Sequence, residues 1–211
     1  MKIAVIGASG FVGSKIVDEA LLNGYQVKGI FRTNPIKKRN NLELFQMTIF
    51  DEKKLEEVLS DVDCVISAYN PGYYHVAQTK RYVEAYDLIF DVCKRLNKRI
   101  IVVIGATSLI GSDGELVKDG FYPKPWINAL EGTDFVYNKY KDDKSLNVTF
   151  VSPAAELIEG KRTTNYQYGN DHLLFDSNFE SRISTEDLAH AIIKEVKSQK
   201  YLNTRFTIAY K

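Results

Sequence analysis

Short apolar runs alternate with amphipathic stretches along most of the 211-residue chain, and this alternation strongly constrains its fold. Runs such as Ala4–Ile6 and Ile100–Ile104 are apolar at consecutive positions, as is typical of strands covered on both faces. The pattern predicts strands over Ile3–Ile6, Gln26–Phe31, Leu42–Met47, Asp63–Ser67, Ile100–Ile104, Val148–Ser152 and Phe206–Ala209. It predicts helices near Phe11–Asn23, Lys53–Leu59, Val76–Leu96, Trp126–Lys141 and Thr185–Ser198. Strand–helix–strand repetition predicts an α/β fold, a Rossmann-like doubly wound parallel sheet of about seven strands with helices on both faces.

The chain is long enough for one well-buried domain, and it shows no repeat, low-complexity tract or Pro/Gly-rich linker. We therefore expect a single domain over residues 1–211. Two segments interrupt the alternation, Gly105–Pro125 and Ala154–Ile183. Both follow strand ends, where open α/β sheets bind ligands, so we expect Ala154–Ile183 to form a substrate-side segment.

Composition excludes several classes of partner. Twenty-eight basic and 27 acidic residues give a formal charge of +1, which offers no field to attract nucleic acid or an anionic membrane. Two cysteines, Cys64 and Cys93, form no CxxC pair, and no signal peptide is seen, so we expect a cytoplasmic protein. The apolar run Ile100–Ile104 is too short to span a bilayer. We expect a monomer or a homodimer that binds small molecules.

The loop GASGFVG at residues 7–13 follows a buried strand and opens an amphipathic helix. In a dinucleotide site Gly7 permits the tight turn, Gly10 lets the backbone approach a pyrophosphate, and Gly13 lets helix and strand pack closely. The helix N-terminus then presents unpaired N–H groups to the phosphates. A merely tight strand–helix turn is the alternative. The predicted cofactor-binding residues of this loop are Gly7, Ser9, Gly10, Phe11, Val12 and Gly13.

An arginine stands where an NAD site usually carries an acid. Arg32 lies 19 residues after Gly13, at the end of the second predicted strand. Arginine cannot accept from a ribose hydroxyl, but it can bind a 2′-phosphate through charge-assisted hydrogen bonds. Nearby polar and basic residues are Thr33, Lys37, Lys38 and Arg39. The sequence therefore favours NADP(H) over NAD(H), with a solvated basic turn as the alternative.

Several further stretches resemble one superfamily across essentially the whole chain. TIFD, VISAYNPG, GATSLIG, VSPAAEL and GNDHLLFDSNFESRISTEDLAHAII, together with the glycine loop, resemble the atypical short-chain dehydrogenases. More narrowly, the chain resembles their NmrA-like and flavin-reductase-like NAD(P)H-binding branch. The resemblance implies that Asp51 bonds the adenine, Ala68 lines the adenosine–ribose wall, and Pro153 contacts the nicotinamide through its backbone. Taken alone, Asp51 also fits the N-cap of the helix over Lys53–Leu59, and the two roles are compatible.

The chain departs from the classical Tyr-x-x-x-Lys acid–base pair of that superfamily. Tyr137 and Lys141 fit the expression, but Tyr137 lies only 16 residues before Pro153, near the far end of its predicted helix. We interpret the match as coincidental and Tyr137 as a packing or surface residue. Without such a pair, alcohol or ketone chemistry lacks its general acid–base.

Reduction of a flavin or a quinone has less need of that pair, because the acceptor ring delocalises the charge and solvent supplies the proton. Aromatic side chains near the predicted site fit a planar acceptor or cover the core: Tyr69, Tyr73, Tyr74, Tyr122, Trp126, Tyr166, Tyr168 and Phe175. Ser108 follows the fifth strand and is the candidate catalytic residue, bonding substrate or nicotinamide amide; the alternative is that it satisfies its loop.

The three histidines, His75, His172 and His190, show no metal-ligand spacing, so no metal site is predicted. We interpret His190 as a structural residue, whereas His172 lies in the substrate-side segment. Ser184 and Asp187 resemble a helix-capping box.

The preferred function is an NADPH-dependent oxidoreductase that passes hydride to a flavin or quinone-like acceptor. A non-catalytic NmrA-like regulator that senses NADP(H) is the alternative. A sugar-nucleotide epimerase or dehydratase fits less well, because such enzymes are usually longer and need a properly placed Tyr/Lys pair.

Overall fold

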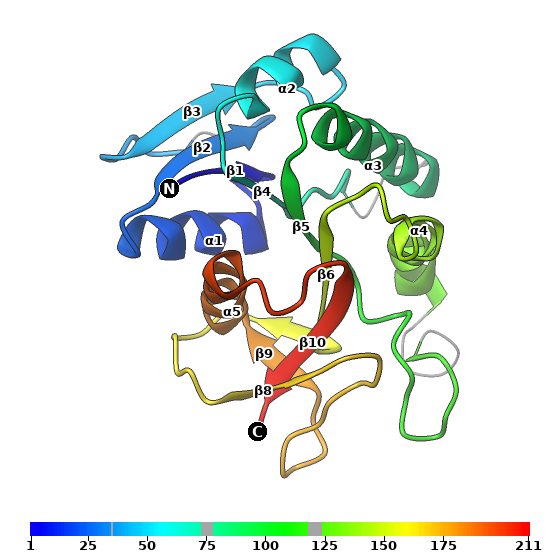
Figure 1. Ribbon diagram of the computed structural model, residues 1–211. Coiled ribbons are helices and arrows are strands. Elements are labelled where there is room, and N and C mark those ends of the chain that lie inside the picture. The colour runs from blue at the N-terminus through cyan, green and yellow to red at the C-terminus, as the bar shows by residue number, and fades with distance from the viewer. Residues whose placement is uncertain (35, 73–77, 118–123) are drawn as a thin grey trace.

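The computed structural model describes residues 1–34, 36–72, 78–117 and 124–211, which are built around an eight-stranded sheet (Figure 1). The strands lie in the order β3-β2-β1-β4-β5-β6-β10-β8, and only β8 pairs antiparallel. Their bounds are β1 (Lys2–Ile6), β2 (Gln26–Phe31), β3 (Leu42–Gln46), β4 (Cys64–Ser67), β5 (Arg99–Val103), β6 (Val148–Pro153), β8 (Tyr166–Gly169) and β10 (Thr204–Tyr210). All seven predicted strands are confirmed, and β8 adds an eighth that the sequence pattern did not predict.

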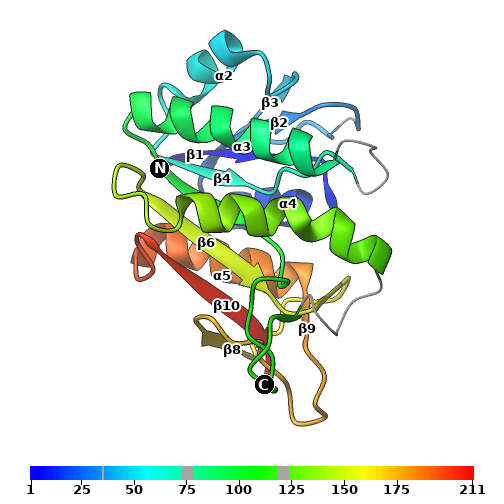
Figure 2. The same ribbon diagram turned by 90° about the vertical axis from the view of Figure 1, so that its right-hand side faces the viewer.

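Helices cover both faces of the sheet (Figures 1 and 2). On one face lie α1 (Phe11–Leu22) and α5 (Thr185–Ser198). On the other lie α2 (Glu52–Leu59), α3 (Gln78–Arg95) and α4 (Lys124–Tyr140). This is a Rossmann-like doubly wound α/β fold, as predicted. None of the described helices is long and apolar enough to cross a membrane.

Each face of the sheet has its own apolar core. Ala4 and Ile6 of β1 belong to the core under α3 and α4, together with the fully buried Phe90. Ile3 and Val5 belong to the core under α1 and α5. Alternate residues of one strand thus enter opposite cores, which explains why its sequence is apolar at consecutive positions.

The strand order indicates at which edge of the sheet a ligand would bind. β1 lies between β2 and β4, and the chain builds β2 and β3 on one side of it and β4, β5 and β6 on the other. The strand order therefore reverses between β1 and β4, and ligands of such sheets bind beyond the carboxyl ends of the strands at this point. Gly7 and Ala68 immediately follow those two strands.

The segment Ala154–Ile183 is more regular than its sequence suggested. β7 (Glu156–Ile158) pairs in parallel with β9 (Arg182–Ser184) in a separate two-stranded sheet, and β8 joins β10 at the edge of the main sheet. Three- and four-residue strands are too short to show a period of two, so periodicity did not reveal them.

A buried carboxylate fastens this segment to α5. Asp187 is fully buried in the first turn of α5, where its backbone N–H donates to Ser184 Oγ at 3.1 Å in the predicted cap. Its carboxylate accepts from the backbone N–H groups of Thr163 and Thr164 at 2.9 and 2.8 Å, and from the Thr163 hydroxyl at 2.7 Å. One side chain therefore joins the start of α5 to the loop before β8.

Asp187→Ala should lower the free energy of unfolding by about 2–3 kcal/mol, because the donors of the loop before β8 would lose the carboxylate that now accepts from them. Glu180→Ala is the matched control, since Glu180 is an exposed carboxylate of the same segment paired with Arg182, and it should cost less than about 1 kcal/mol. Urea unfolding monitored by circular dichroism measures both. Equal losses for the two variants would contradict the anchoring role.

Candidate functional site

Backbone atoms of other segments lie against the glycine loop on two sides. Gly7 has a φ of +82°, and a Cβ built on it would lie 2.7 Å from the carbonyl oxygen of Ala68, after β4. On the other side its N–H donates to the carbonyl of Ile30 in β2 at 3.0 Å. Only glycine fits a position with both this conformation and this contact.

Gly13 lets the first turn of α1 rest on the loop. A Cβ on Gly13 would lie 2.0 Å from the carbonyl oxygen of Gly7 and 2.7 Å from its carbonyl carbon. Both atoms belong to backbone, so a side chain could be accommodated only by moving the helix away from β1. The geometry accounts for glycine at both ends of the motif.

The middle glycine faces open space at a helix end that can receive an anion. Gly10 is exposed and extended, and a Cβ on it would meet only the Gly7 carbonyl oxygen, at 3.2 Å. No described side chain caps α1 and no acid lies in its first turn, whereas Asp51 and Ser184 cap α2 and α5. The first N–H groups and the positive dipole end of α1 therefore suit a pyrophosphate. Around Gly10, Phe11 is exposed, and the remaining loop candidates are half-buried: Ser9 and Val12.

Arg32 is exposed and follows β2, two residues after Ile30, whose carbonyl accepts from the N–H groups of Gly7 and Ala8 in the glycine loop. The surrounding charge is smaller than the sequence suggested, because Arg39 forms an ion pair with Asp18 of α1. Lys37 and Lys38 remain exposed. Arg32 is thus a cation at the strand end where a 2′-phosphate would lie in such a fold.

Asp51 and Ala68 follow β3 and β4, the strands that flank the β2–β1 pair on its two sides. Asp51 is exposed and caps α2, its Oδ1 accepting from the N–H of Lys54 at 3.1 Å. The prediction that Asp51 caps this helix is therefore confirmed, and the second carboxylate oxygen of Asp51 can still accept from another donor. The N–H of Ala68 donates to Ile6 at 3.0 Å, which fixes this strand end against the glycine loop.

On the substrate side, Pro153 ends β6, buried and opposite Ile208 of β10. Proline has no N–H, so its backbone can offer a nicotinamide only a carbonyl. Ser108 lies in the loop after β5, and its Oγ accepts from Arg205 Nη1 at 3.0 Å. The neighbouring Thr107 is fully buried and donates to Asp134 at 2.5 Å. Both hydroxyls therefore help to hold the loop in place.

Arg205 joins three segments around Ser108, and the sequence analysis did not predict this role. Its nearly buried guanidinium donates to Ser108 and, through Nε at 3.0 Å, to Asp171 of the substrate-side segment. It also lies over the ring of Tyr137 in α4, 4.2 Å from the centroid. A charged residue in the strand β10, which otherwise holds only threonine and apolar or aromatic residues, was the available signal. His172 is exposed beside this cluster and forms a β-bridge with Ile110.

Tyr137 packs through its ring, and the charge of Arg205 opposes the effect of burial on the pKa of its hydroxyl. The ring is half-buried, at 90° to Phe150 with centroids 5.3 Å apart. Burial raises the pKa of Tyr137 above its ordinary value, so the phenol stays protonated at neutral pH. Lys141 Nζ lies over the ring at 5.6 Å from its centroid. These contacts support the interpretation that the Tyr-x-x-x-Lys match is coincidental.

Most of the aromatic candidates that the structure describes belong to packing. The Tyr166 hydroxyl bonds His190 Nδ1 at 2.7 Å, and Tyr168 packs against Tyr201 and Phe206. Phe175 is half-buried under the substrate-side loops. Tyr69 is half-buried after β4, close to the glycine loop. Outside the described residues lie Tyr73, Tyr74, Tyr122 and the side chain of Trp126.

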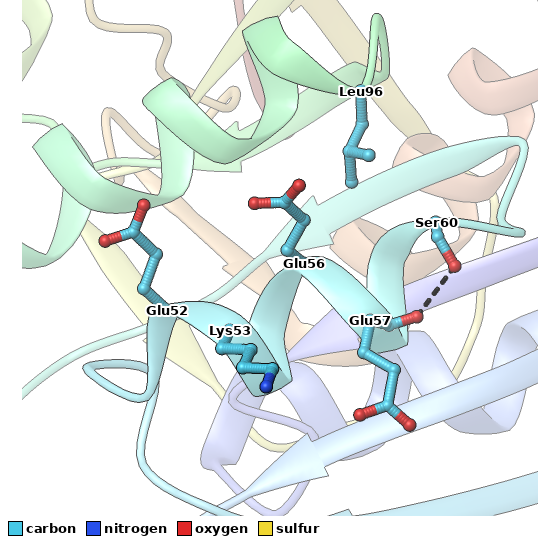
Figure 3. A pocket seen from close by; sticks show the side chains of 6 residues that line it. All are labelled: Glu52, Lys53, Glu56, Glu57, Ser60 and Leu96. Carbon is cyan, nitrogen blue, oxygen red and sulfur yellow. Dashed lines mark hydrogen bonds between the residues drawn. The ribbon is translucent and has the colours of Figure 1, made fainter.

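A surface pocket lies away from this site (Figure 3). It is lined by Glu52, Lys53, Glu56, Glu57, Ser60 and Leu96, from α2 and the end of α3. Three carboxylates against one ammonium make it a poor site for the phosphates of a dinucleotide. Among the described residues, no group of three or more His, Cys, Asp or Glu could hold a metal ion.

Gly10→Val should abolish dinucleotide binding in a folded protein, because the new side chain occupies the space that the pyrophosphate needs. Gly13→Ala is the contrasting variant, since its methyl group would meet backbone, and it should lower the free energy of unfolding by about 1–3 kcal/mol. Calorimetry with NADPH and thermal melting separate the two effects. Near-normal NADPH affinity in folded Gly10→Val would refute the site.

Comparison with known proteins agrees with this geometry. The uncharacterized Bacillus subtilis (strain 168) protein YwnB is 30% identical, over 99% of this chain and 98% of its own. A Bacteroides thetaiotaomicron structure described as a candidate epimerase is 33% identical, covering 99% of this chain and 96% of its own with a TM-score of 0.90. A Streptococcus pneumoniae TIGR4 structure described as a candidate NADH-flavin reductase is 27% identical, covering 100% of both chains with a TM-score of 0.88. Residues 7–199 match the model of the NAD(P)H-binding family, and the chain belongs to that family.

Proposed function

We propose that the protein is an NADPH-dependent oxidoreductase that reduces a flavin or quinone-like planar acceptor. The observation that carries the proposal is the uncapped N-terminus of α1, together with the exposed Arg32 after the neighbouring strand β2, on a chain of the NAD(P)H-binding family. The Streptococcus structure described as a candidate NADH-flavin reductase supports this acceptor class. The proposal takes residues 1–211 as one cytoplasmic domain, with Ala154–Ile183 on the substrate side.

The residues present fit this cofactor. The N–H groups at the start of α1 would hold the pyrophosphate, Arg32 the 2′-phosphate, and Asp51 the adenine amine through its second carboxylate oxygen. Ala68 would line the ribose wall and Pro153 would face the nicotinamide. The preference for NADP(H) over NAD(H) rests on Arg32, since no acid follows β2 to accept from a free ribose 2′-hydroxyl.

The substrate side suits an acceptor that needs little proton transfer from the protein. When bound, the nicotinamide supplies a hydride, and a flavin or quinone delocalises the resulting charge until solvent protonates it. Tyr137 is engaged in packing and its pKa is raised, so it is poorly placed to act as the acid. Ser108 can still donate one hydrogen bond: arginine has only donors, so Ser108 Oγ accepts from Arg205 and keeps its own proton for another partner.

A regulator that senses NADP(H) without turnover is the second candidate. Thr107 and Ser108 both hydrogen-bond within the protein, so these two loop hydroxyls already serve the structure of the chain. The epimerase reading draws support from the Bacteroides structure described as a candidate epimerase, but such chemistry needs the positioned acid–base that Tyr137 does not supply.

A steady-state screen of NADPH oxidation against flavins, quinones and aldehydes tests the proposal. We expect turnover with a flavin or a quinone. Tyr137→Phe should keep that turnover within a few-fold of wild type, because its hydroxyl has no catalytic role. A loss of about 10²–10⁴-fold, the scale of a positioned acid–base, would revive carbonyl chemistry. Tight NADP(H) binding without turnover would favour the regulator.

Arg32→Ala should weaken NADPH binding far more than NADH binding, because only NADPH carries the 2′-phosphate. Losing one or two charge-assisted hydrogen bonds corresponds to roughly 10- to 10³-fold in affinity, and solvent exposure favours the lower end. The measurement is the ratio of NADPH to NADH dissociation constants for both proteins at one ionic strength. A wild-type preference for NADH would rule out the NADP assignment.

A further inference from the structure

Arg81, at the start of α3, has a buried N–H donor that makes no hydrogen bond to any described residue. Its guanidinium carbon lies 5.1 Å from the ring centroid of Phe50, in the loop after β3. Its Nε is buried and has no hydrogen-bond partner. No described carboxylate forms an ion pair with Arg81, although Lys80 beside it pairs with Glu84. A buried N–H left unpaired is costly, which suggests that a ligand completes this environment.

The position of Arg81 points to the adenosine end of the dinucleotide site. Phe50 immediately precedes Asp51, so the contact of Arg81 with the Phe50 ring places the guanidinium beside the residue that caps α2. Tyr69 follows β4 directly after Ala68. Burial raises the pKa of Tyr69, and the positive charges of Arg81 and Arg32 both oppose that rise. Arg81 thus lies against the loop after β3, at the carboxyl edge of the sheet.

We propose that Arg81 binds the adenine ring of the cofactor opposite Asp51, an inference that rests on the dinucleotide site of the proposed function. Phe50 is exposed and immediately precedes Asp51, whose second carboxylate oxygen can accept from the adenine amine. The ring nitrogens of adenine only accept, and a guanidinium only donates, so the two residues match the two kinds of atom on one base. The planar guanidinium, supported by Phe50, also offers a surface on which a base stacks.

Arg81 and Arg32 should therefore have different signatures in binding. The two probes are 5′-AMP and 2′,5′-ADP, which share adenosine and the 5′-phosphate and differ only in the 2′-phosphate. Arg81→Gln should weaken both by the same factor, about three- to thirtyfold, whereas Arg32→Ala should weaken only 2′,5′-ADP. Arg81→Lys should lose nearly as much as Arg81→Gln, because an ammonium lacks the planar surface.

The experiment is isothermal calorimetry on the full chain, with thermal melting to confirm folding. Arg95→Gln is the matched control: it removes an exposed arginine of the same helix that pairs with Glu52 and Glu56, and both affinities should stay at the wild-type value. Unchanged binding in folded Arg81→Gln, a loss confined to 2′,5′-ADP, or full rescue by Arg81→Lys would each overturn adenine binding by Arg81. These fragments undergo no hydride transfer, so failure of the reductase proposal would leave the result intact, whereas no fragment binding by wild type would overturn the dinucleotide site with it.

Discussion

The candidate site depends on one contact between backbone atoms, where the first turn of α1 rests on the carbonyl of Gly7. Because no Cβ intervenes at Gly13, the helix begins directly beyond β1, and its N-terminus comes to the place where the strand order reverses. The same loop is fixed by Ile30 of β2 and by Ala68, which follows β4. Any phosphate bound there would meet donors that are already oriented, so little ordering would be needed on binding.

The other half of the site is organised by side chains. The Arg205 guanidinium is removed from water, and such a charge is tolerated only where hydrogen bonds and an opposite charge compensate it. Asp171, the oxygens of Ser108 and the face of Tyr137 provide that compensation from three separate segments. The glycine loop is therefore held through backbone contacts, whereas the geometry around Ser108 and Asp171 depends on one cation and its partners.

The sequence predicted those parts of the molecule whose structure follows from local pattern. The seven parallel strands were predictable because burial on both faces imposes short apolar runs on most of them, and the helices because their apolar residues recur on one face. By contrast, β7 and β9 are only three residues long, and their pairing joins positions 26 residues apart, such as Glu156 and Arg182. The role of Arg205 and the pairing of Arg39 with Asp18 are likewise long-range contacts that composition does not encode. The residues taken from the family resemblance remain predictions to be tested by binding.

The fastening of the substrate-side segment at Asp187 has an evolutionary consequence. The loop that carries Thr163 and Thr164 is held by Asp187, and the Ser184 hydroxyl donates to the Lys161 carbonyl at 3.3 Å. The two ends of the excursion from this loop to β9 are thus joined at the start of α5, while β8 and Asp171 hold its middle to β10. In its exposed turn at residues 177–180, loop-closure entropy changes only slowly with length. Insertions and deletions there can accumulate without disturbing the N-terminus of α1. A lineage can in this way alter this surface while inheriting the glycine loop unchanged.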